Sequence, residues 1–422
     1  MTDTNAAGLG ARQAALALLT EVMEEGQTMA QVLAQRDGPL KGVAPADRAR
    51  AQRLALQVVR QMEPVDKLLE PLLRKEPPLL VMNILRLAVT ELAAGTAAHG
   101  VVNAAVELAQ RGKRTAPMAG LVNAVLRKVP VGTALPGPAQ RMPRWLRQPL
   151  VHAYGRDAVN AIEAVHASAP PLDITPRGAV LPDGERLPTG SIRLNEPGQV
   201  SALPGFESGD WWVQDAAAAL AVPLLGVKPG EQVLDLCAAP GGKTLQLAAA
   251  GAVVTALDMS APRMERVAEN LARTGLSARL VVADALHWRP EALFDAVLLD
   301  APCSATGTIR RHPELPFLKD GTELAELVTL QRAMFDIALS MLKPGGRLVF
   351  CTCSLLPEEG ELQLAGALAR HSGLRVVRPE LAGVDPAWIT EAGGLRLRPD
   401  YWADRGGMDG FFMALVVKSG TV

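Results

Sequence analysis

Five short apolar runs, each followed by a loop and a helical stretch, organise the chain after Gln214. The runs span residues 232–237, 253–258, 279–283, 296–300 and 347–353. Alternation of this kind is typical of a parallel sheet with helices on both faces. Ligands of such sheets bind at the carboxyl ends of the strands. We therefore expect an α/β domain over residues 213–420, with its functional residues along one edge of the sheet.

The first 131 residues show a different periodicity. Their apolar residues recur at three- and four-residue steps, without strand-like alternation. This pattern predicts an all-α bundle over residues 1–131, with a break at 112–117. A stretch rich in Pro, Gly and Thr at 130–138 predicts a linker. Residues 140–212 are interpreted as linker and a small α+β subdomain, with one helix expected over 145–167.

Charge is distributed unevenly along the chain. The net charge is only −1, but residues 1–150 carry 19 Lys and Arg against 12 Asp and Glu, whereas the remainder carries 24 against 32. Residues 108–156 contain no acid at all. A charge run is often just a solvated face, but a solubilising surface usually mixes signs. An anionic partner such as RNA is therefore expected for the basic residues of this stretch, chiefly Arg111, Lys113, Arg114, Arg127 and Lys128.

Four cysteines and the apolar runs bear on the cellular compartment. No apolar run approaches the roughly 18 residues that span a bilayer, and the N-terminal stretch at 14–19 is too short for a signal peptide. The cysteines all lie in the second half, unlike a secreted disulfide framework. We expect a cytoplasmic protein with free thiols and no membrane partner. The sequence does not determine the oligomeric state, and a monomer is expected.

A glycine turn connects the first expected strand to a helix, in Val233-Leu-Asp-Leu-Cys-Ala-Ala-Pro-Gly-Gly-Lys-Thr244. Glycines let a backbone approach a ligand closely, and helix N-termini favour negative groups. The Gly-Lys-Thr ending is not a phosphate loop, because Cys237 stands where that motif has Gly. Taken alone, the turn is also compatible with a plain connection.

Aspartates end successive strands of the expected sheet. Asp258 closes the second strand, Asp284 the third and Asp300 the fourth. Buried aspartates are costly unless paired, so this row indicates a ligand. Asp258 can accept hydrogen bonds from ribose hydroxyls, as the acid about 20 residues beyond the glycine turn does in dinucleotide-binding folds. An adenosine-containing cofactor fits the row. S-adenosylmethionine fits best, because no pyrophosphate-binding loop is evident.

Two cysteines follow the fourth and fifth strands, in Asp300-Ala-Pro-Cys-Ser304 and Cys351-Thr-Cys-Ser354. A free cysteine is usually a small buried apolar residue, and the spacing is a poor match to zinc sites, so no metal is expected. A thiolate has a further use beside a methyl donor. By adding to carbon 6 of a cytosine it makes carbon 5 able to attack a methylsulfonium. These residues alone do not decide between Cys303 and Cys353 as nucleophile.

With these motifs the sequence resembles the Sun-type RNA cytosine-5 methyltransferase family, whose catalytic domain is a Rossmann-like class I methyltransferase. The N-terminal bundle resembles the NusB-type RNA-binding domain, and this combination resembles the bacterial members that act on small-subunit (16S) ribosomal RNA. The match runs over most of the chain, through Val102–Ala109, Val122–Lys128, Val213–Asp215, Leu236–Thr244, Asp300–Ser304, Arg310-Arg-His-Pro-Glu314, Thr352–Ser354 and Asp409-Gly-Phe-Phe412.

The resemblance implies roles for the motif residues. Cys353 would be the nucleophile and Cys303 the aid to its release, with Asp300 and Lys243 as further catalytic groups. Asp258 would hold the ribose of the cofactor, Asp284 its adenine, and Asp300 would lie between cofactor and cytosine. The methionine end of the cofactor would lie against Cys237, Ala238, Ala239, Pro240, Gly241, Gly242 and Lys243.

Two positions depart from the family pattern. Ala305 stands where the family commonly has Gly, which is expected only to tighten a turn. Residues 171–176 replace the usual Arg-Val-Asn, so the resemblance assigns no RNA contacts to the middle subdomain. The alternatives are methylation of a transfer RNA or of another ribosomal cytosine, and a non-catalytic RNA-binding assembly factor. The NusB-like half argues against the first, and the two intact thiols argue against the second.

Overall fold

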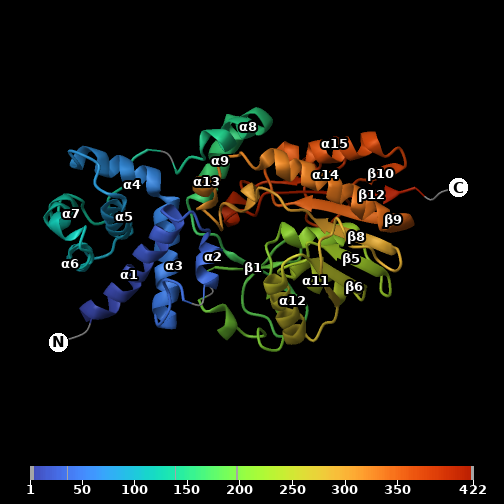
Figure 1. Cartoon of the computed structure of the whole chain (residues 1–422), viewed down its shortest axis with the longest axis horizontal. Coiled ribbons are helices and arrows are strands. Elements are labelled where there is room, and N and C mark those ends of the chain that lie inside the picture. Colours follow the sequence, from blue (N-terminus) through green and yellow to red (C-terminus); the bar gives the residue numbers. More distant parts are fainter. Residues whose placement is uncertain (1–3, 36, 138, 196–197, 420–422) are drawn as a thin grey trace. The chain divides into compact units, whose positions relative to one another are not determined.

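The computed structural model describes residues 4–35, 37–137, 139–195 and 198–419, which form two compact units (Figure 1). The first unit comprises Met1–Ala169 together with Ile309–Asp320, and the second comprises Pro170–Thr308 and Gly321–Val422. The short segment 309–320 therefore belongs with the N-terminal part of the chain, although it lies between two parts of the second unit in sequence.

The first unit is helical throughout its described residues. Its central helix is α5 (Leu79–Ala93), in which every residue from Val81 to Leu92 is buried. A helix buried on all sides must be surrounded by others, and the helices packed against α5 are α1 (Thr4–Met23), α3 (Pro45–Arg60), α4 (Met62–Leu69), α6 (Ala98–Arg111) and α7 (Ala119–Leu126). The unit also contains α2 (Met29–Ala34), η1 (Glu70–Leu72), η2 (Ala116–Met118), α8 (Arg144–Tyr154), α9 (Arg156–His166) and α13 (Leu315–Leu318). The expected all-α bundle is confirmed.

The single helix expected over 145–167 is wrong. The structure has two helices, because Gly155 between α8 and α9 adopts a φ of +83°. A residue in that region cannot continue a right-handed helix, and glycine enters it without steric cost.

The second unit begins with a small antiparallel sheet of order β2-β3-β1-β4. Its core gathers Ile174, Ile192, Leu194 and Trp211. The strands are β1 (Leu172–Pro176), β2 (Glu185–Arg186), β3 (Ile192–Leu194) and β4 (Trp211–Val213). With α8 and α9 before it in sequence, this sheet accounts for the mixed composition of residues 140–212.

A larger sheet of order β10-β12-β9-β8-β5-β6-β7 follows. The neighbours from β9 through β8, β5 and β6 to β7 are parallel, whereas β12 runs antiparallel to β9 and β10 and also pairs with β11. The strands are β5 (Gln232–Leu236), β6 (Val253–Asp258), β7 (Arg279–Val282), β8 (Phe294–Asp300), β9 (Leu342–Thr352), β10 (Leu374–Val377), β11 (Leu395–Leu397) and β12 (Phe411–Lys418). All five expected strands are present.

Helices cover both faces of this sheet, as the alternation along β8 shows. Val297 and Leu299 pack in the cluster that contains residues of α14 and α15, whereas Ala296 and Leu298 pack in the cluster with α10 and α11. Figure 1 shows α14 and α15 on one side of the sheet and α11 and α12 on the other. The helices are α10 (Ala221–Leu225), α11 (Gly242–Ala249), α12 (Ala261–Thr274), α14 (Leu324–Ser340) and α15 (Glu361–Arg370), with short 3-10 turns η3 (Val200–Ala202), η4 (Ala218–Leu220), η5 (Thr306–Thr308), η6 (Pro357–Glu359), η7 (Pro386–Trp388) and η8 (Ala403–Arg405).

The strand order has a topological switch point at the centre of the sheet. β5 pairs with β6 on one side and with β8 on the other, so the connections diverge at β5. In open α/β sheets, ligands bind outside the carboxyl ends of the strands at such a point. Within the described ranges, no helix is both long and apolar enough to cross a bilayer.

Candidate active site

The loop after β5 has the backbone of a ligand-binding turn. Cys237 adopts a φ of +62° and Gly241 a φ of +104°. A side chain at Gly241 would be strained, and its Cβ would lie 3.2 Å from Val267 Cγ1 on α12. The loop therefore needs glycine at this position to pass close to α12 before α11 begins at Gly242.

Asp235 and Asp258 lie at the base of this loop. Asp235 is fully buried, and its Oδ2 accepts a hydrogen bond of 2.6 Å from Thr244 Oγ1, while its Oδ1 has no protein partner among the described residues. Burial raises the pKa of Asp235 to about 7. Asp258 accepts hydrogen bonds from Ala239 N (3.2 Å) and Ser260 N (2.9 Å). Asp258 thus fixes the turn itself, in addition to any contact with a ligand.

Asp284 lies beyond the end of β7 and is half exposed. Its Oδ1 accepts a hydrogen bond of 2.9 Å from Leu286 N, and its Oδ2 lies 2.7 Å from His287 Nδ1. The backbone hydrogen bond from Leu286, together with His287, lowers the pKa of this carboxyl. Asp284 therefore remains an ionised acceptor at neutral pH.

Lys243 and Asp300 form an ion pair at the carboxyl end of β8. Lys243 Nζ lies 2.7 Å from Asp300 Oδ2, and the lysine side chain is only 10% exposed. Burial acts to lower the pKa of Lys243, but the charge of Asp300, the hydrogen bond to it and the charges of Cys351 and Asp235 together raise that pKa. Cys351 Sγ lies 3.5 Å from Asp300 Oδ1. The ammonium also lies 5.1 Å from the centre of the Phe411 ring, a cation–π contact that the sequence motifs did not indicate.

The two motif cysteines lie against each other. Cys303 Sγ and Cys353 Sγ are 3.5 Å apart, and both residues are partly exposed. The hydrogen bond with Cys353 and burial together raise the pKa of Cys303 well above the ordinary thiol value. Cys303 therefore holds its proton and can donate it toward the sulfur of Cys353. Cys351, in contrast, is fully buried within β9, and burial raises its pKa.

The loop that carries Cys303 is closely packed. Ala305 adopts a φ of +57°, the left-handed region that favours glycine, so the glycine of the family pattern has a conformational reason. Gly307 N donates to Cys353 O (3.0 Å), and Gly410 N donates to Gly307 O (2.8 Å). These bonds connect the loop both to the end of β9 and to the start of β12.

Two further motifs meet in the second unit. Asp409 N donates to Asp215 Oδ1 (3.1 Å), which also accepts from Ala217 N (2.9 Å). The Val213–Asp215 and Asp409–Phe412 motifs are therefore in contact, although nearly 200 residues separate them in sequence. Neither Asp215 nor Asp409 was expected to be a site residue.

The Arg310–Glu314 motif lies in the first unit. Arg60 Nη2 donates to Arg310 O (2.9 Å), and Met29 N donates to Glu314 Oε1 (3.2 Å). Burial lowers the pKa of Arg60 to about 10, although the charge of Glu314 opposes this shift. The motif is thus held by helices of the bundle.

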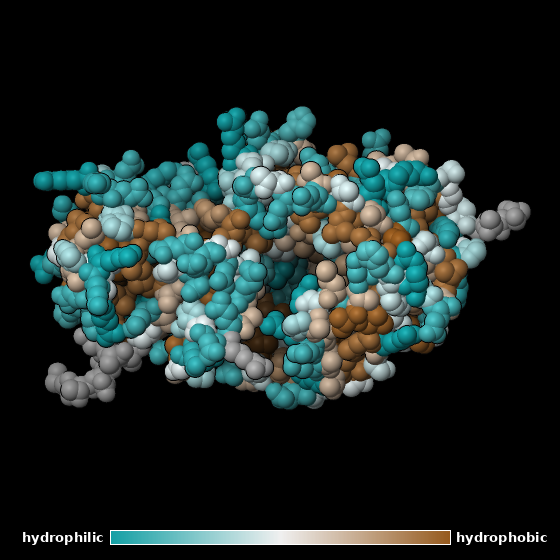
Figure 2. Space-filling view, in the orientation of Figure 1, coloured by the Kyte–Doolittle hydropathy of each residue, from teal (hydrophilic) through white to brown (hydrophobic). Residues whose placement is uncertain are grey.

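The five basic residues expected to bind RNA are all exposed. Arg111 ends α6, and its guanidinium pairs with Glu107 at 2.8 Å. The remaining four lie in the connection between α6 and α7 or directly after α7. In the view of Figure 2, hydrophilic side chains cover much of the surface of the N-terminal helices, interrupted by apolar patches. The site remains a prediction.

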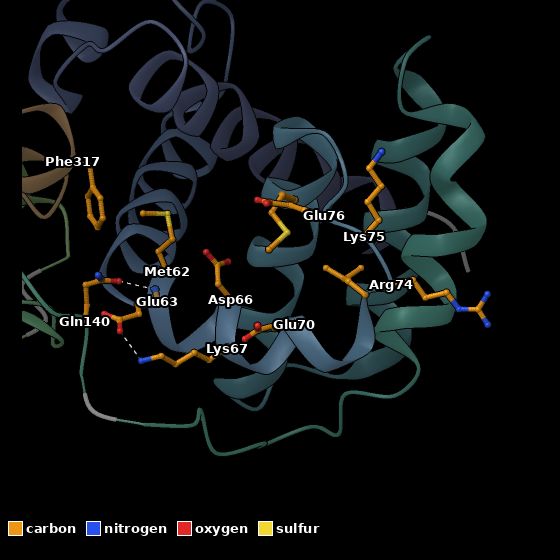
Figure 3. A pocket seen from close by; sticks show the side chains of 12 residues that line it. Met62, Glu63, Asp66, Lys67, Glu70, Arg74, Lys75, Glu76, Gln140 and Phe317 are labelled. Carbon is orange, nitrogen blue, oxygen red and sulfur yellow. Dashed lines mark hydrogen bonds and ion pairs between the residues drawn. The ribbon is translucent and has the colours of Figure 1, made fainter. Parts of the chain in front are cut away.

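A pocket of about 590 Å³ lies elsewhere in the first unit (Figure 3). Its wall includes Glu63, which pairs with Lys67 (2.6 Å) and whose backbone N–H donates to Gln140 Oε1 (2.7 Å). None of the motif residues lines this pocket, whose walls mix acidic, basic and apolar side chains. The sequence motifs therefore assign no role to this pocket.

Comparisons with known proteins give matches to both parts of the chain. Residues 222–417 match the family model for the 16S rRNA methyltransferase RsmB/F, and residues 9–130 match the NusB family model. The chain is 33% identical to ribosomal RNA small subunit methyltransferase B of Pectobacterium atrosepticum, over 97% of this chain and 98% of that protein. It is 36% identical to the protein of the same name from Pseudomonas syringae, over 88% and 89%.

Solved structures show the same fold. The crystal structure of PH0851 matches with a TM-score of 0.74 and 25% identity, over 97% of this chain and 99% of that one. A methyltransferase homologue from Pyrococcus horikoshii matches with a TM-score of 0.55 and 27% identity, over 64% and 93%. The chain therefore belongs to the 16S rRNA methyltransferase RsmB/F family, as an S-adenosylmethionine-dependent rRNA methyltransferase with a NusB-family domain at its N-terminus.

Proposed function

We propose that this enzyme methylates carbon 5 of a cytosine in 16S ribosomal RNA, through a covalent adduct between Cys353 and carbon 6 of the base. The observation that carries the proposal is the 3.5 Å approach of the Cys303 and Cys353 sulfurs, which follow adjacent strands. The relatives named above are small-subunit rRNA methyltransferases, which supports 16S RNA as the substrate. We further propose that it acts in the cytoplasm, where that RNA is assembled into ribosomes.

The residues around the β5 loop fit the cofactor. Asp235 Oδ1 is a buried acceptor without a protein partner among the described residues, and the carboxylate of Asp258 lies against the turn. Asp258 would hold the ribose, Asp284 the adenine, and Cys237 to Lys243 the methionine end. Asp300 would contact both the cofactor and the base. When bound, S-adenosylmethionine supplies the electrophilic methyl group.

Each catalytic side chain then has a defined task. The Cys353 thiolate forms a bond to carbon 6, and the displaced electron pair makes carbon 5 nucleophilic. After methylation, a base, for which we propose the Asp300 carboxylate, takes the proton from carbon 5. The electron pair of that bond restores the double bond between carbons 5 and 6 and expels the Cys353 thiolate. Cys303 would give its thiol proton to the departing Cys353 sulfur, which favours release, and would regain a proton from solvent before the next cycle. The Lys243–Asp300 pair fixes the polar environment of the base.

The two cysteines can be separated by experiment because they act at different steps. Cys353→Ala should abolish both methyl transfer and any protein–RNA cross-link. Cys303→Ala should turn over at least ~100-fold more slowly, within the range of an acid–base contribution, and should accumulate RNA-linked protein. The measurement is a denaturing gel of each variant after incubation with RNA and S-adenosylmethionine.

Cys351→Ala is the matched thiol control. Cys351 is fully buried and not accessible to the base, although its Sγ lies 3.5 Å from Asp300 Oδ1, so the variant should still form the adduct. A stable cross-link with Cys353→Ala and none with Cys303→Ala would reverse the two assignments. Mapping 5-methylcytosine in ribosomal RNA from cells with and without the gene would identify the modified position, and loss from transfer RNA instead would contradict the 16S substrate.

A further inference from the structure

Beneath the two cysteines lies a buried carboxylate, that of Glu359, which the proposed chemistry does not use. Glu359 ends the 3-10 turn η6 and is fully buried. Its Oε1 accepts hydrogen bonds from Ser304 N (2.8 Å) and Gln331 Nε2 (2.9 Å). Its Oε2 accepts from Ser354 Oγ (2.5 Å) and from Ser304 Oγ. A buried carboxylate needs several donors to offset its lost hydration, and these four supply them.

The donors come from both cysteine loops. Ser304 directly follows Cys303, and Ser354 directly follows Cys353. One carboxylate thus accepts hydrogen bonds from the residues next to each thiol. Gln331 of α14 extends the connection, because its Nε2 also donates to Pro302 O (2.8 Å), on the other side of Cys303.

Further bonds close the network around Glu359. Thr306 Oγ1 lies 3.2 Å from both Ser304 Oγ and Ser354 Oγ, and it accepts from Leu355 N (3.0 Å). Thr352 Oγ1 donates to the backbone carbonyl of Glu359 (2.9 Å). Because each hydroxyl has a partner, neither loop can shift without leaving a buried polar group unpaired, which is costly.

We propose that Glu359 is a positioning residue that sets the distance between the Cys303 and Cys353 thiols by binding the serine after each of them. The inference rests on the proposed function only in taking these thiols as the reacting pair. Since the proposal concerns the distance between the two sulfurs, it can be tested without any RNA. The residue's length matters as much as its charge, since its two oxygens must reach both loops at once.

Thiol cross-linking measures this spacing. Diamide oxidises two thiols to one disulfide: the sulfurs form the new bond and lose two electrons and two protons, and the azo group of diamide is reduced to a hydrazine. The Cys303 and Cys353 sulfurs need to close from 3.5 Å to about 2 Å. The rate of forming the Cys303–Cys353 disulfide at pH 8, followed by peptide mapping, therefore reports their relative placement.

Three variants of Glu359 and one control test the proposal on the full chain. Glu359→Ala removes both acceptor atoms. Glu359→Asp keeps the charge but is one methylene too short to reach both loops. Glu359→Gln keeps the length, and its amide can still bind the Ser304 N–H through oxygen and the serine hydroxyls through nitrogen. The control is Glu358→Ala at the neighbouring position, whose buried Oε2 has no hydrogen-bond partner among the described residues.

We expect Glu359→Ala and Glu359→Asp to slow both disulfide formation and single-turnover methyl transfer, by up to ~100-fold for a displacement of about 1 Å. Glu359→Gln should stay within a few-fold of wild type, Glu358→Ala should match wild type, and every variant should bind S-adenosylmethionine with unchanged affinity. If Glu359→Ala does not fold, the comparison of Glu359→Asp with Glu359→Gln still tests the positioning role.

The outcomes that overturn the inference are distinct from those that overturn the function. Wild-type cross-linking in folded Glu359→Asp would exclude a positioning role. A slow Glu359→Gln beside a fast Glu359→Asp would exclude it as well, because that pattern indicates a need for charge alone. If the thiol spacing depends on Glu359 but Cys353→Ala still methylates RNA, the positioning role stands and the proposed chemistry fails.

Discussion

At the scale of single residues, three aspartates in or directly after the neighbouring strands β5, β6 and β7 have three different environments. Asp235 is buried with one unpartnered oxygen among the described residues, Asp258 is buried but bound by two backbone N–H groups, and Asp284 is half exposed. In the sequence, each is an aspartate within or directly after an apolar run, yet burial and hydrogen bonds give these carboxyls different environments for their charge. Their contributions to binding and stability should therefore differ.

Asp258→Ala should weaken S-adenosylmethionine binding by about ten- to a hundred-fold, the effect of losing hydrogen bonds to a charged acceptor, roughly 1.5–3 kcal/mol. Part of the loss would come through the turn, since Ala239 N would lose its acceptor. Calorimetry with the purified protein measures the affinity, and Glu358→Ala, which is not proposed to contact the cofactor, serves as the control. Unchanged affinity in Asp258→Ala would exclude Asp258 from the ribose site.

Asp235 should make the stability of the cofactor-free enzyme depend on pH. Its folded-state pKa of about 7 lies above the ordinary value of 3.8 because of burial. The folded protein thus binds this proton more tightly than the unfolded chain, and the stability it contributes is lost as pH rises from about 4 through about 7. The side chain of Asp235→Asn cannot titrate. The free energy of unfolding of this variant, relative to that of the wild type, should therefore increase by on the order of 3 kcal/mol between pH 4 and pH 8.

Urea unfolding of both proteins at a series of pH values measures this difference. In Asp235→Asn, the amide oxygen of the new side chain can replace Asp235 Oδ2 as the acceptor for Thr244 Oγ1, so the comparison at low pH serves as the baseline. Unfolding free energies that run parallel across this pH range would show that Asp235 titrates normally in the folded protein.

At the scale of elements, the small sheet depends on a buried ion pair between facing strands. Asp173 on β1 pairs in register with Arg193 on β3, and Arg193 Nε and Nη2 donate to the two carboxylate oxygens at 2.7 and 2.8 Å. Both side chains are fully buried, and Asp173 Oδ2 also accepts from Ala216 N (3.1 Å). Asp173 lies within residues 171–176, which depart from the family pattern. This segment thus contributes to the stability of the small sheet.

Asp173→Ala should destabilise the second unit by about 3–5 kcal/mol, because it leaves Arg193 buried without its counter-charge. The control is Glu185→Ala, which removes the partly exposed partner of Arg405 and should cost at most about 1 kcal/mol. Chemical denaturation compares the two variants. Equal losses would indicate that water reaches Arg193 in the variant and that the pair is not a stability determinant.

The elements that the sequence predicted correctly are those whose signal is local. Apolar runs located β5 to β9, and three-to-four-residue periodicity located the helices of the bundle. The break at Gly155 was missed because a single glycine within a periodic stretch does not reveal its φ. β12 was not predicted either. Residues 411–417 form an apolar run like the others, but no local pattern indicates that this strand pairs antiparallel between β9 and β10.

In the candidate site too, the sequence indicated the residues that lie in motifs but not the residue that supports them through tertiary contacts. The motifs indicated Cys303, Cys353, Lys243 and Asp300, and the structure brings these together as two close pairs. The supporting residue Glu359 was not found, since a glutamate in a Pro-Glu-Glu turn has the composition of an exposed loop. Its burial becomes visible only when Ser304 and Ser354 are placed beside it.

At the scale of the whole molecule, one segment groups in space with a part of the chain that is far from it in sequence. Residues 309–320 lie within the span of the methyltransferase family model but group with the N-terminal helices. Arg310 and Glu314 are both buried there, and bonds to Arg60 and Met29 hold the segment. The sequence of the Arg310–Glu314 motif, which lies between two strands of an α/β domain, does not indicate that it packs in the N-terminal helical unit. The N-terminal unit is thus built from two separate stretches of chain.

The exposed basic residues of the N-terminal unit lead to a prediction for the whole enzyme. If Arg111, Lys113, Arg114, Arg127 and Lys128 contact phosphates, RNA affinity should fall steeply with salt, with a log–log slope of about 0.7–0.9 per contact. Reversing the charge of Lys113, Arg114 and Lys128 should then flatten the slope by roughly 2–3 and leave S-adenosylmethionine binding unchanged.

The matched control reverses the charge of Lys41, Arg74 and Lys75, which are also exposed in this unit, and so changes the net charge equally. Filter binding of 16S RNA fragments between about 50 and 300 mM salt provides the slopes. A specific contact surface requires the first triple variant to differ from the second, whereas equal flattening in both would mean that only the overall charge attracts the RNA.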